Sequence, residues 1–207
     1  MCRFKSGEAV LRSDRLDILT VPGEDSHTSI REYHKVPEAN GGMADKYHTP
    51  MEFVPVRGLF VEADYDLIFD AGKPEWWMDD MVPEARRQFW AAVSGEIDGK
   101  SLVRDSAGWS LYLSSLTSLP EGVTLSAGGA LDLSALTSLP EGVTLSAGRA
   151  LDLSALTSLP EGVTLSAGRD LYHNSLTSLP KGVTLSAGRG LYLPHALQRE
   201  LATRTRP

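Results

Sequence analysis

Residues 64–70 read Asp-Tyr-Asp-Leu-Ile-Phe-Asp, and their three carboxylates are one candidate group for catalysis or metal binding. The aspartates Asp64, Asp66 and Asp70 are separated by even numbers of residues, so an extended chain directs all three to one face. Three carboxylates on one face suit a hard cation such as Mg²⁺, as in a metal-dependent hydrolase. The same pattern fits a solvated strand face, and no phosphate-cradling glycine loop or nucleophile motif accompanies it. We therefore expect no catalytic residues and keep the hydrolase as an alternative.

The segment 73–81, KPEWWMDDM, joins Trp76 and Trp77 to the acidic pair Asp79 and Asp80. Adjacent side chains cannot both face the same core, so one tryptophan should be partly exposed or packed at a junction between modules. An aromatic anchor beside acidic residues suits a hot spot for a basic protein surface. The segment would form a DNA-like negative surface together with Asp64, Asp66, Asp70 and Glu84.

The histidines offer no metal motif. His27, His34 and His48 lack the spacing of metal ligands, and a separation of seven places His27 and His34 on one helix side only if that helix begins early. We expect neither a metal site nor a cofactor.

Elements that would position these residues are of mixed α and β type. The amino-acid patterns of residues 9–21, 51–56 and 65–69 predict strands. One helix should follow Ser26, whose hydroxyl can cap its first turn, and another should open at Pro83 in the favoured first position. The N-terminal part is therefore predicted to be an α+β head.

The rest of the chain repeats itself with a period of 20 residues. Full units begin at Leu111, Leu131, Leu151 and Leu171, and the second reads LDLSALTSLPEGVTLSAGRA. A fixed period of this size predicts a solenoid, in which each unit buries its apolar row by stacking on its neighbours. Alternation within the unit predicts two short strands per coil.

The phrase LTSLPEGV resembles leucine-rich repeats, particularly the short 20-residue class of bacterial effector proteins. The resemblance implies protein recognition. The family's asparagine position is absent, so we expect a flat two-sided β-solenoid instead of a curved horseshoe. The second position of each unit forms an outward column in which Tyr112 and Tyr172 are candidate contacts, although stacked strand tyrosines also serve structure alone.

Both open ends of a solenoid need covering. The helix opening at Pro83 leads into the repeats and is predicted to cap the first coil with its apolar side. The tail after Pro194 has helix-like apolar spacing and is predicted to cap the last coil. The expected organisation is an acidic head over residues 1–98, a solenoid over 99–193 and a C-terminal helical cap and tail over 194–207.

Charge separates the two modules. The chain of 207 residues has 20 basic and 27 acidic side chains, a formal charge of −7. Residues 1–100 hold 12 basic and 19 acidic side chains, and the remainder holds 8 of each. An acidic total argues against direct nucleic-acid binding and favours a partner with a basic surface. The single cysteine, Cys2, and the lack of a signal or membrane-spanning segment predict a soluble cytoplasmic protein.

The phrases SHTSIREYHKV and KPEWW resemble, over a short stretch, the N-terminal regions of phage and prophage proteins that place repeats after a small head. This resemblance implies an inhibitor that blocks a host protein, including a defence protein. The expected function is therefore non-catalytic protein binding by surface occupation, through steric blocking or nucleic-acid mimicry. A metal-dependent hydrolase and a structural assembly protein stay open as alternatives.

Overall fold

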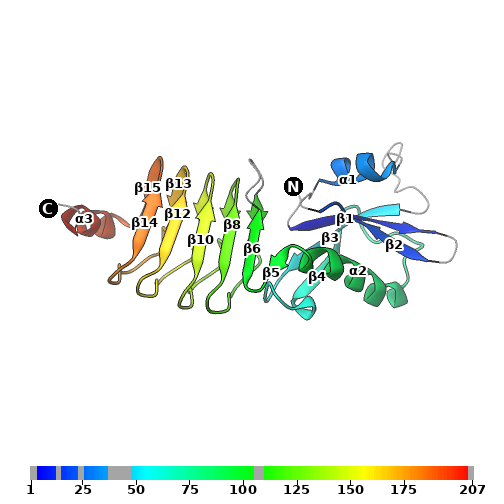
Figure 1. Ribbon diagram of the computed structural model, residues 1–207, viewed down its shortest axis with the longest axis horizontal. Coiled ribbons are helices and arrows are strands. Elements are labelled where there is room, and N and C mark those ends of the chain that lie inside the picture. The colour runs from blue at the N-terminus through cyan, green and yellow to red at the C-terminus, as the bar shows by residue number, and fades with distance from the viewer. Residues whose placement is uncertain (1–3, 13–14, 23–25, 37–47, 105–109, 205–207) are drawn as a thin grey trace. The chain divides into compact units, whose positions relative to one another are not determined.

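The fold is that of a computed structural model, which describes residues 4–12, 15–22, 26–36, 48–104 and 110–204 (Figure 1). The chain divides into two compact units. The head unit comprises residues 1–55 and 60–97, and the solenoid unit comprises residues 56–59 and 98–207. The short segment 56–59 belongs to the solenoid although it lies within the head in sequence, and its Arg57 carbonyl accepts a hydrogen bond from Ser118 Oγ (3.1 Å).

The head unit is built on one antiparallel sheet with the strand order β2-β1-β3-β4. Its strands are β1 (Lys5–Leu11), β2 (Leu16–Leu19), β3 (His48–Pro55) and β4 (Tyr65–Phe69). The expectation of one strand over residues 9–21 was wrong: β1 ends at Leu11 and pairs antiparallel with β2, and Arg12 N donates to Arg15 O (2.9 Å). The strand expected at 65–69 is confirmed.

Two helices cover opposite faces of this sheet (Figure 1). Helix α1 (His27–His34) begins where Ser26 Oγ accepts a hydrogen bond from Ser29 N (3.4 Å), as the capping pattern predicts. Helix α2 (Val82–Ser94) carries Pro83 in its first turn. Two short 3₁₀ turns, η2 (Glu62–Asp64) and η3 (Asp79–Met81), precede β4 and α2.

The apolar side of α2 packs on the head's own sheet. The Phe89 ring stacks on Phe53 of β3, with ring centroids 5.5 Å apart. It lies so close to β1 that a Cβ on Gly7 would come within 2.7 Å of it, which is why this strand position has no side chain. The prediction that α2 turns its apolar side to the first coil of the repeats was therefore wrong, because the sheet offers an aromatic surface that the sequence pattern did not reveal.

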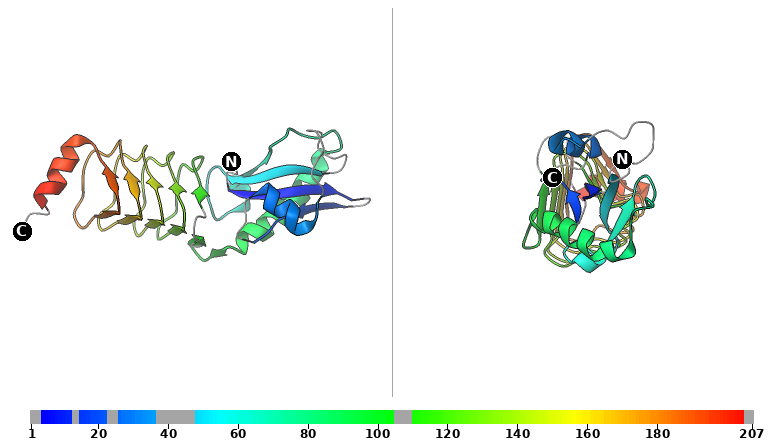
Figure 2. Two further views of the ribbon diagram at one scale, coloured as in Figure 1. Left: turned by 90° about the horizontal axis from the view of Figure 1, so that it is seen from above. Right: turned by 90° about the vertical axis from the view of Figure 1, so that its right-hand side faces the viewer.

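The solenoid unit is built on two sheets, one on each side of the coils, in which the strands of successive coils pair in parallel (Figures 1 and 2). One has the order β14-β12-β10-β8-β6-β5, and the other has the order β15-β13-β11-β9-β7. The first sheet comprises β5 (Ile97–Asp98), β6 (Ser101–Arg104), β8 (Thr124–Ala127), β10 (Thr144–Ala147), β12 (Thr164–Ala167) and β14 (Thr184–Ala187). The second comprises β7 (Leu111–Tyr112), β9 (Leu131–Asp132), β11 (Leu151–Asp152), β13 (Asp170–Tyr172) and β15 (Gly190–Tyr192). The two-sided β-solenoid is thus confirmed.

Equivalent residues of successive units pair in register, for example Leu145 with Leu165. A threonine ladder joins successive coils. Thr157 donates to the Thr137 carbonyl through its backbone N (3.2 Å) and its Oγ1 (3.1 Å), and Thr177 repeats both bonds to Thr157. These bonds satisfy backbone groups in the loop between the two sheets, where no strand pairing is available.

Helix α3 (His195–Arg204) follows the last coil (Figure 2). Its Leu197 is buried, and its Gln198 Nε2 donates to the Leu193 carbonyl (2.8 Å). The predicted helix at the C-terminal end of the solenoid is therefore confirmed, and it packs on the last coil through Leu197 and Gln198. The sequence Ser106-Ala107-Gly108 matches the Ser-Ala-Gly of the repeat and predicts a half unit before the first full one, but it lies outside the described residues.

Candidate functional site

A cluster of charged side chains is buried on the face of the head sheet that α1 covers. Cross-strand register places Ser6 opposite Glu52 and Glu8 opposite Pro50, so both glutamates project from the same face. Glu8 is completely buried and Glu52 is 2% exposed. Carboxylates rarely reach this degree of burial unless they are paired or bind an ion, so this face is the first candidate site.

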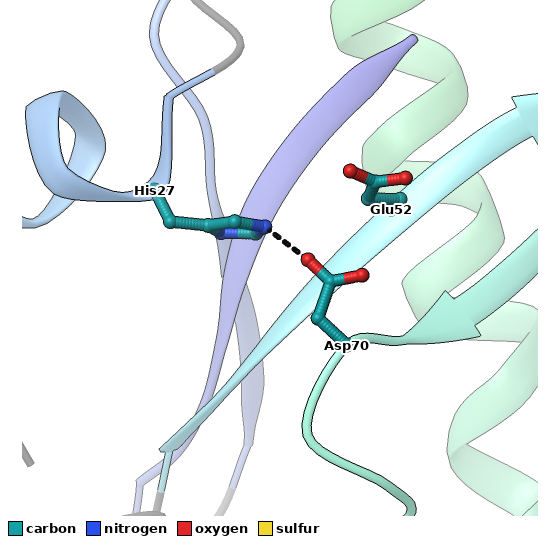
Figure 3. Close-up of side chains that lie close together, drawn as sticks. All are labelled: His27, Glu52 and Asp70. Carbon is teal, nitrogen blue, oxygen red and sulfur yellow. Dashed lines mark hydrogen bonds and ion pairs between the residues drawn. The ribbon is translucent and has the colours of Figure 1, made fainter. Parts of the chain in front are cut away.

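His27, the first residue of α1, lies between two carboxylates of this face. Its Nδ1 is 3.3 Å from Glu8 Oε1, and its Nε2 is 2.7 Å from Asp70 Oδ2 (Figure 3). Burial lowers the pKa of His27, but Glu8 and Asp70 outweigh this effect and raise the pKa above its ordinary value.

Glu8 is the centre of the network. It accepts a hydrogen bond from Arg31 NH1 (2.9 Å), one helical turn after His27, and its Oε2 lies 3.4 Å from Nδ1 of the buried His48. Two histidines and one arginine therefore face a single buried carboxylate. This arrangement gathers three nitrogen-bearing side chains around Glu8.

Only one of the three predicted carboxylates belongs to this cluster. Asp70 follows β4 and contacts His27, whereas Asp66 is exposed on β4 and Asp64 lies in the 3₁₀ turn η2. The expectation that all three aspartates share one strand face was wrong for Asp64, because the extended backbone begins only at Tyr65. Glu8 and Glu52 were missed as site residues, and His27 was considered only together with His34 and His48, because the members of this cluster are far apart in sequence.

A second candidate site lies on the opposite face of the head, where α2 packs. Gln88 of α2 fixes its wall: its Nε2 donates to the Leu16 carbonyl (2.8 Å), and its Oε1 accepts from Ile18 N (2.7 Å). Next to this wall is an open groove of about 830 Å³. Its described lining residues are Leu11, Arg12, Arg15, Leu16, Asp17, Met78, Asp80, Met81, Glu84 and Gln88.

The aromatic and acidic segment contributes unequally to that groove. Trp77 is buried and packs edge-on against Phe69, with centroids 4.9 Å apart, so it is not accessible to a partner. Trp76 is half-buried, as expected for one of two adjacent tryptophans. Met78 is 56% exposed and takes the place of a tryptophan as the apolar contact in the groove.

Cations interrupt the acidic surface. Lys73 Nζ lies 2.6 Å from Asp79 Oδ1 and holds the pKa of that carboxyl below its usual value. The pKa of Glu84 is also lowered, first by a hydrogen bond from Gln88 and then by Arg87. Asp79 and Glu84 therefore have positive or hydrogen-bond-donating neighbours within the acidic segment.

The predicted tyrosine column is part of the solenoid's second sheet. Tyr172 stacks on Tyr192 of the next coil, with centroids 4.7 Å apart and rings inclined by 11°. Tyr112 pairs with Asp132 and is half-buried. In the same column, Asp152 Oδ1 accepts from Ser154 N (2.9 Å). These contacts are internal to the solenoid.

Among the described residues, no helix combines the length and the apolar character needed to cross a bilayer. Comparison of the chain with models of protein families, with curated proteins and with solved structures finds no match.

Proposed function

We propose that this protein is a non-catalytic protein-binding molecule, and that the groove on the α2 face of its head receives a short segment of another polypeptide. The observation that supports this most is the groove itself. Leu11, Leu16, Met78 and Met81 give it apolar surface, and charged side chains surround them. An apolar centre with a polar rim is the usual anatomy of a protein interface.

The charges around the groove indicate the chemistry of the partner. Asp80 and Glu84 lie on the side of η3 and α2, whereas Arg12 and Arg15 lie on the hairpin side, where both contact Asp17. A segment with a large apolar side chain followed by a basic one would place the first on the methionines and the second at Asp80. The excess of acidic residues in 1–100 would steer such a basic segment towards the head.

The solenoid serves in this proposal as a rigid support or second contact. Its resemblance to leucine-rich repeats implies protein recognition, and the resemblance of the head to phage proteins makes a host protein the first partner class to test.

The experiment selects peptides that bind the full-length chain from a displayed random library. We expect selected sequences to combine a large apolar residue with a nearby Lys or Arg. Met78→Glu should weaken their binding at least tenfold, as for an interface hot spot of about 1.4 kcal/mol or more. Val61→Glu is the matched control, because Val61 is also an exposed apolar residue of the head, 55% exposed, but is not among the groove's described lining residues.

Three results would count against the groove: no enrichment of binders, equal effects of Met78→Glu and Val61→Glu, or selected peptides without basic residues. Binders that are insensitive to Met78→Glu but are lost on Tyr172→Ala would move the binding surface to the solenoid.

A further inference from the structure

Three side chains with metal-ligating atoms meet on the α1 face of the head, from three different elements. His27 comes from the start of α1, Glu52 from β3 and Asp70 from the end of β4, and one donor atom of each lies within 4.8 Å of the other two (Figure 3). This is the only such group of His, Cys, Asp and Glu among the residues that the structure describes.

The spacing is close to that of a metal centre. For three atoms no more than 4.8 Å apart, some point lies within about 2.8 Å of each. Divalent zinc binds His nitrogen and carboxylate oxygen at roughly 2.0–2.2 Å. Movements of less than about 1 Å per side chain would therefore complete the coordination. His27 and Asp70 are partly exposed and can make such movements by side-chain rotation, whereas Glu52 is fixed in the sheet.

Glu8 occupies the position of a supporting residue. Its Oε1 lies 3.3 Å from His27 Nδ1, whereas Asp70 contacts the other ring nitrogen, Nε2. Metal-ligating histidines usually donate their second ring N–H to a carboxylate, which selects the tautomer and orients the ring. Glu8 is completely buried and is held by Arg31, so it would keep His27 Nε2 directed at the two ligand carboxylates.

A buried hydroxyl beside Glu52 is an independent sign of a ligand. Ser6 is paired opposite Glu52 and therefore projects from the same face of the sheet. It is completely buried, and its Oγ has no hydrogen-bond partner among the described residues. A hydroxyl in this position can donate to a ligating carboxylate or to a metal-bound water, which would satisfy it.

We propose that His27, Glu52 and Asp70 bind one divalent transition-metal ion, with Glu8 as the positioning residue of His27. One imidazole and two carboxylates suit Zn²⁺ or Mn²⁺, whereas Mg²⁺ and Ca²⁺ prefer oxygen ligands only. Three protein ligands leave a coordination position for water or a small ligand on the exposed side of Asp70. The ion would join α1 to β3 and β4 and so stabilise the head unit.

The test uses the full-length chain after treatment with a chelator. Calorimetric titration with Zn²⁺ should show one equivalent bound, Mn²⁺ should give an electron paramagnetic resonance signal of bound ion, and either ion should raise the thermal unfolding temperature. At the same concentration, Mg²⁺ should neither bind in the calorimetric titration nor raise the thermal unfolding temperature. Absence of Zn²⁺ and Mn²⁺ binding overturns the proposal.

The variants separate ligands from neighbours. Asp70→Asn preserves shape at a partly exposed position and should lower the affinity for Zn²⁺ at least tenfold, and Glu8→Gln should lower it about tenfold as a loss of ring orientation. Asp66→Asn is the matched control, because Asp66 is an exposed aspartate of β4 outside the group, and it should bind as the wild type does. Equal affinities of Asp70→Asn and Asp66→Asn refute the assignment.

This inference is independent of the binding groove, which lies on the opposite face of the sheet. Met78→Glu should leave Zn²⁺ binding unchanged, so failure of one proposal does not decide the other.

Discussion

His173 is a buried imidazole in the apolar interior of the solenoid, and replacing it tests how the coils are stabilised. The other units have Leu113, Leu133 and Leu153 at the equivalent position, all almost completely buried. His173 is likewise completely buried, and neither ring nitrogen has a hydrogen-bond partner among the described residues. Leaving such a group unsatisfied costs about 1–3 kcal/mol, so His173→Leu should stabilise the solenoid by about that amount at pH 7.5.

The effect should grow in acid. Burial lowers the pKa of His173 from its ordinary 6.5 to about 4. The unfolded chain therefore binds this proton between pH 6.5 and 4 while the folded chain does not, so the wild type keeps its full stability above pH 6.5 and loses it as the pH falls. At about 1.4 kcal/mol per pH unit, the wild type should lose about 2 kcal/mol between pH 7.5 and pH 5 through this residue.

The assay is chemical unfolding at pH 7.5 and pH 5.0, with hydrogen exchange of the 151–193 peptides assigning the transition to the solenoid. His173→Leu should remove the acid loss contributed by this site. His195→Leu is the matched control, because it makes the same replacement at an exposed position at the start of α3. If His173→Leu destabilises the protein at both pH values, or if its pH dependence equals that of the wild type, our reasoning about the buried imidazole is refuted.

Two further pairs of variants test the packing. A Cβ on Gly168 would lie 2.2 Å from the Gly148 carbonyl oxygen, so Gly168→Ala should lower the free energy of unfolding by about 3 kcal/mol. The control Gly162→Ala places its Cβ in open space at φ +71° and should lower it by only about 1 kcal/mol. Similar losses for the two variants in denaturant titration would contradict the close stacking of the coils. Glu96→Ala removes the carboxylate 2.6 Å from the completely buried Lys5 Nζ and should cost the head about 3 kcal/mol, whereas Lys73→Ala removes an exposed partner and should change the stability little. Equal thermal shifts for Glu96→Ala and Lys73→Ala would show that the Lys5 pair is not a significant contributor.

The amino-acid sequence by itself determined the elements whose signals are local. The 20-residue period specifies a solenoid because equivalent residues must stack in register, and the observed pairing of Leu145 with Leu165 follows directly. The Ser26 cap, the helix after Pro83 and the strand at 65–69 also depend on neighbouring residues only. Local periodicity and turn chemistry operate within a few residues, so they can be recognised without a structure.

Tertiary structure alone decided which side chains meet. His27, Glu52 and Asp70 become neighbours because β3 lies between β1 and β4 and α1 folds over that face, a strand order that no local pattern encodes. The groove likewise forms only when Gln88 of α2 binds the backbone of β2, 72 residues earlier in the chain. Asp70 was selected from the sequence for its spacing from Asp64 and Asp66, but its contacts come from His27, because side-chain proximity depends on the packing of distant segments and not on sequence separation.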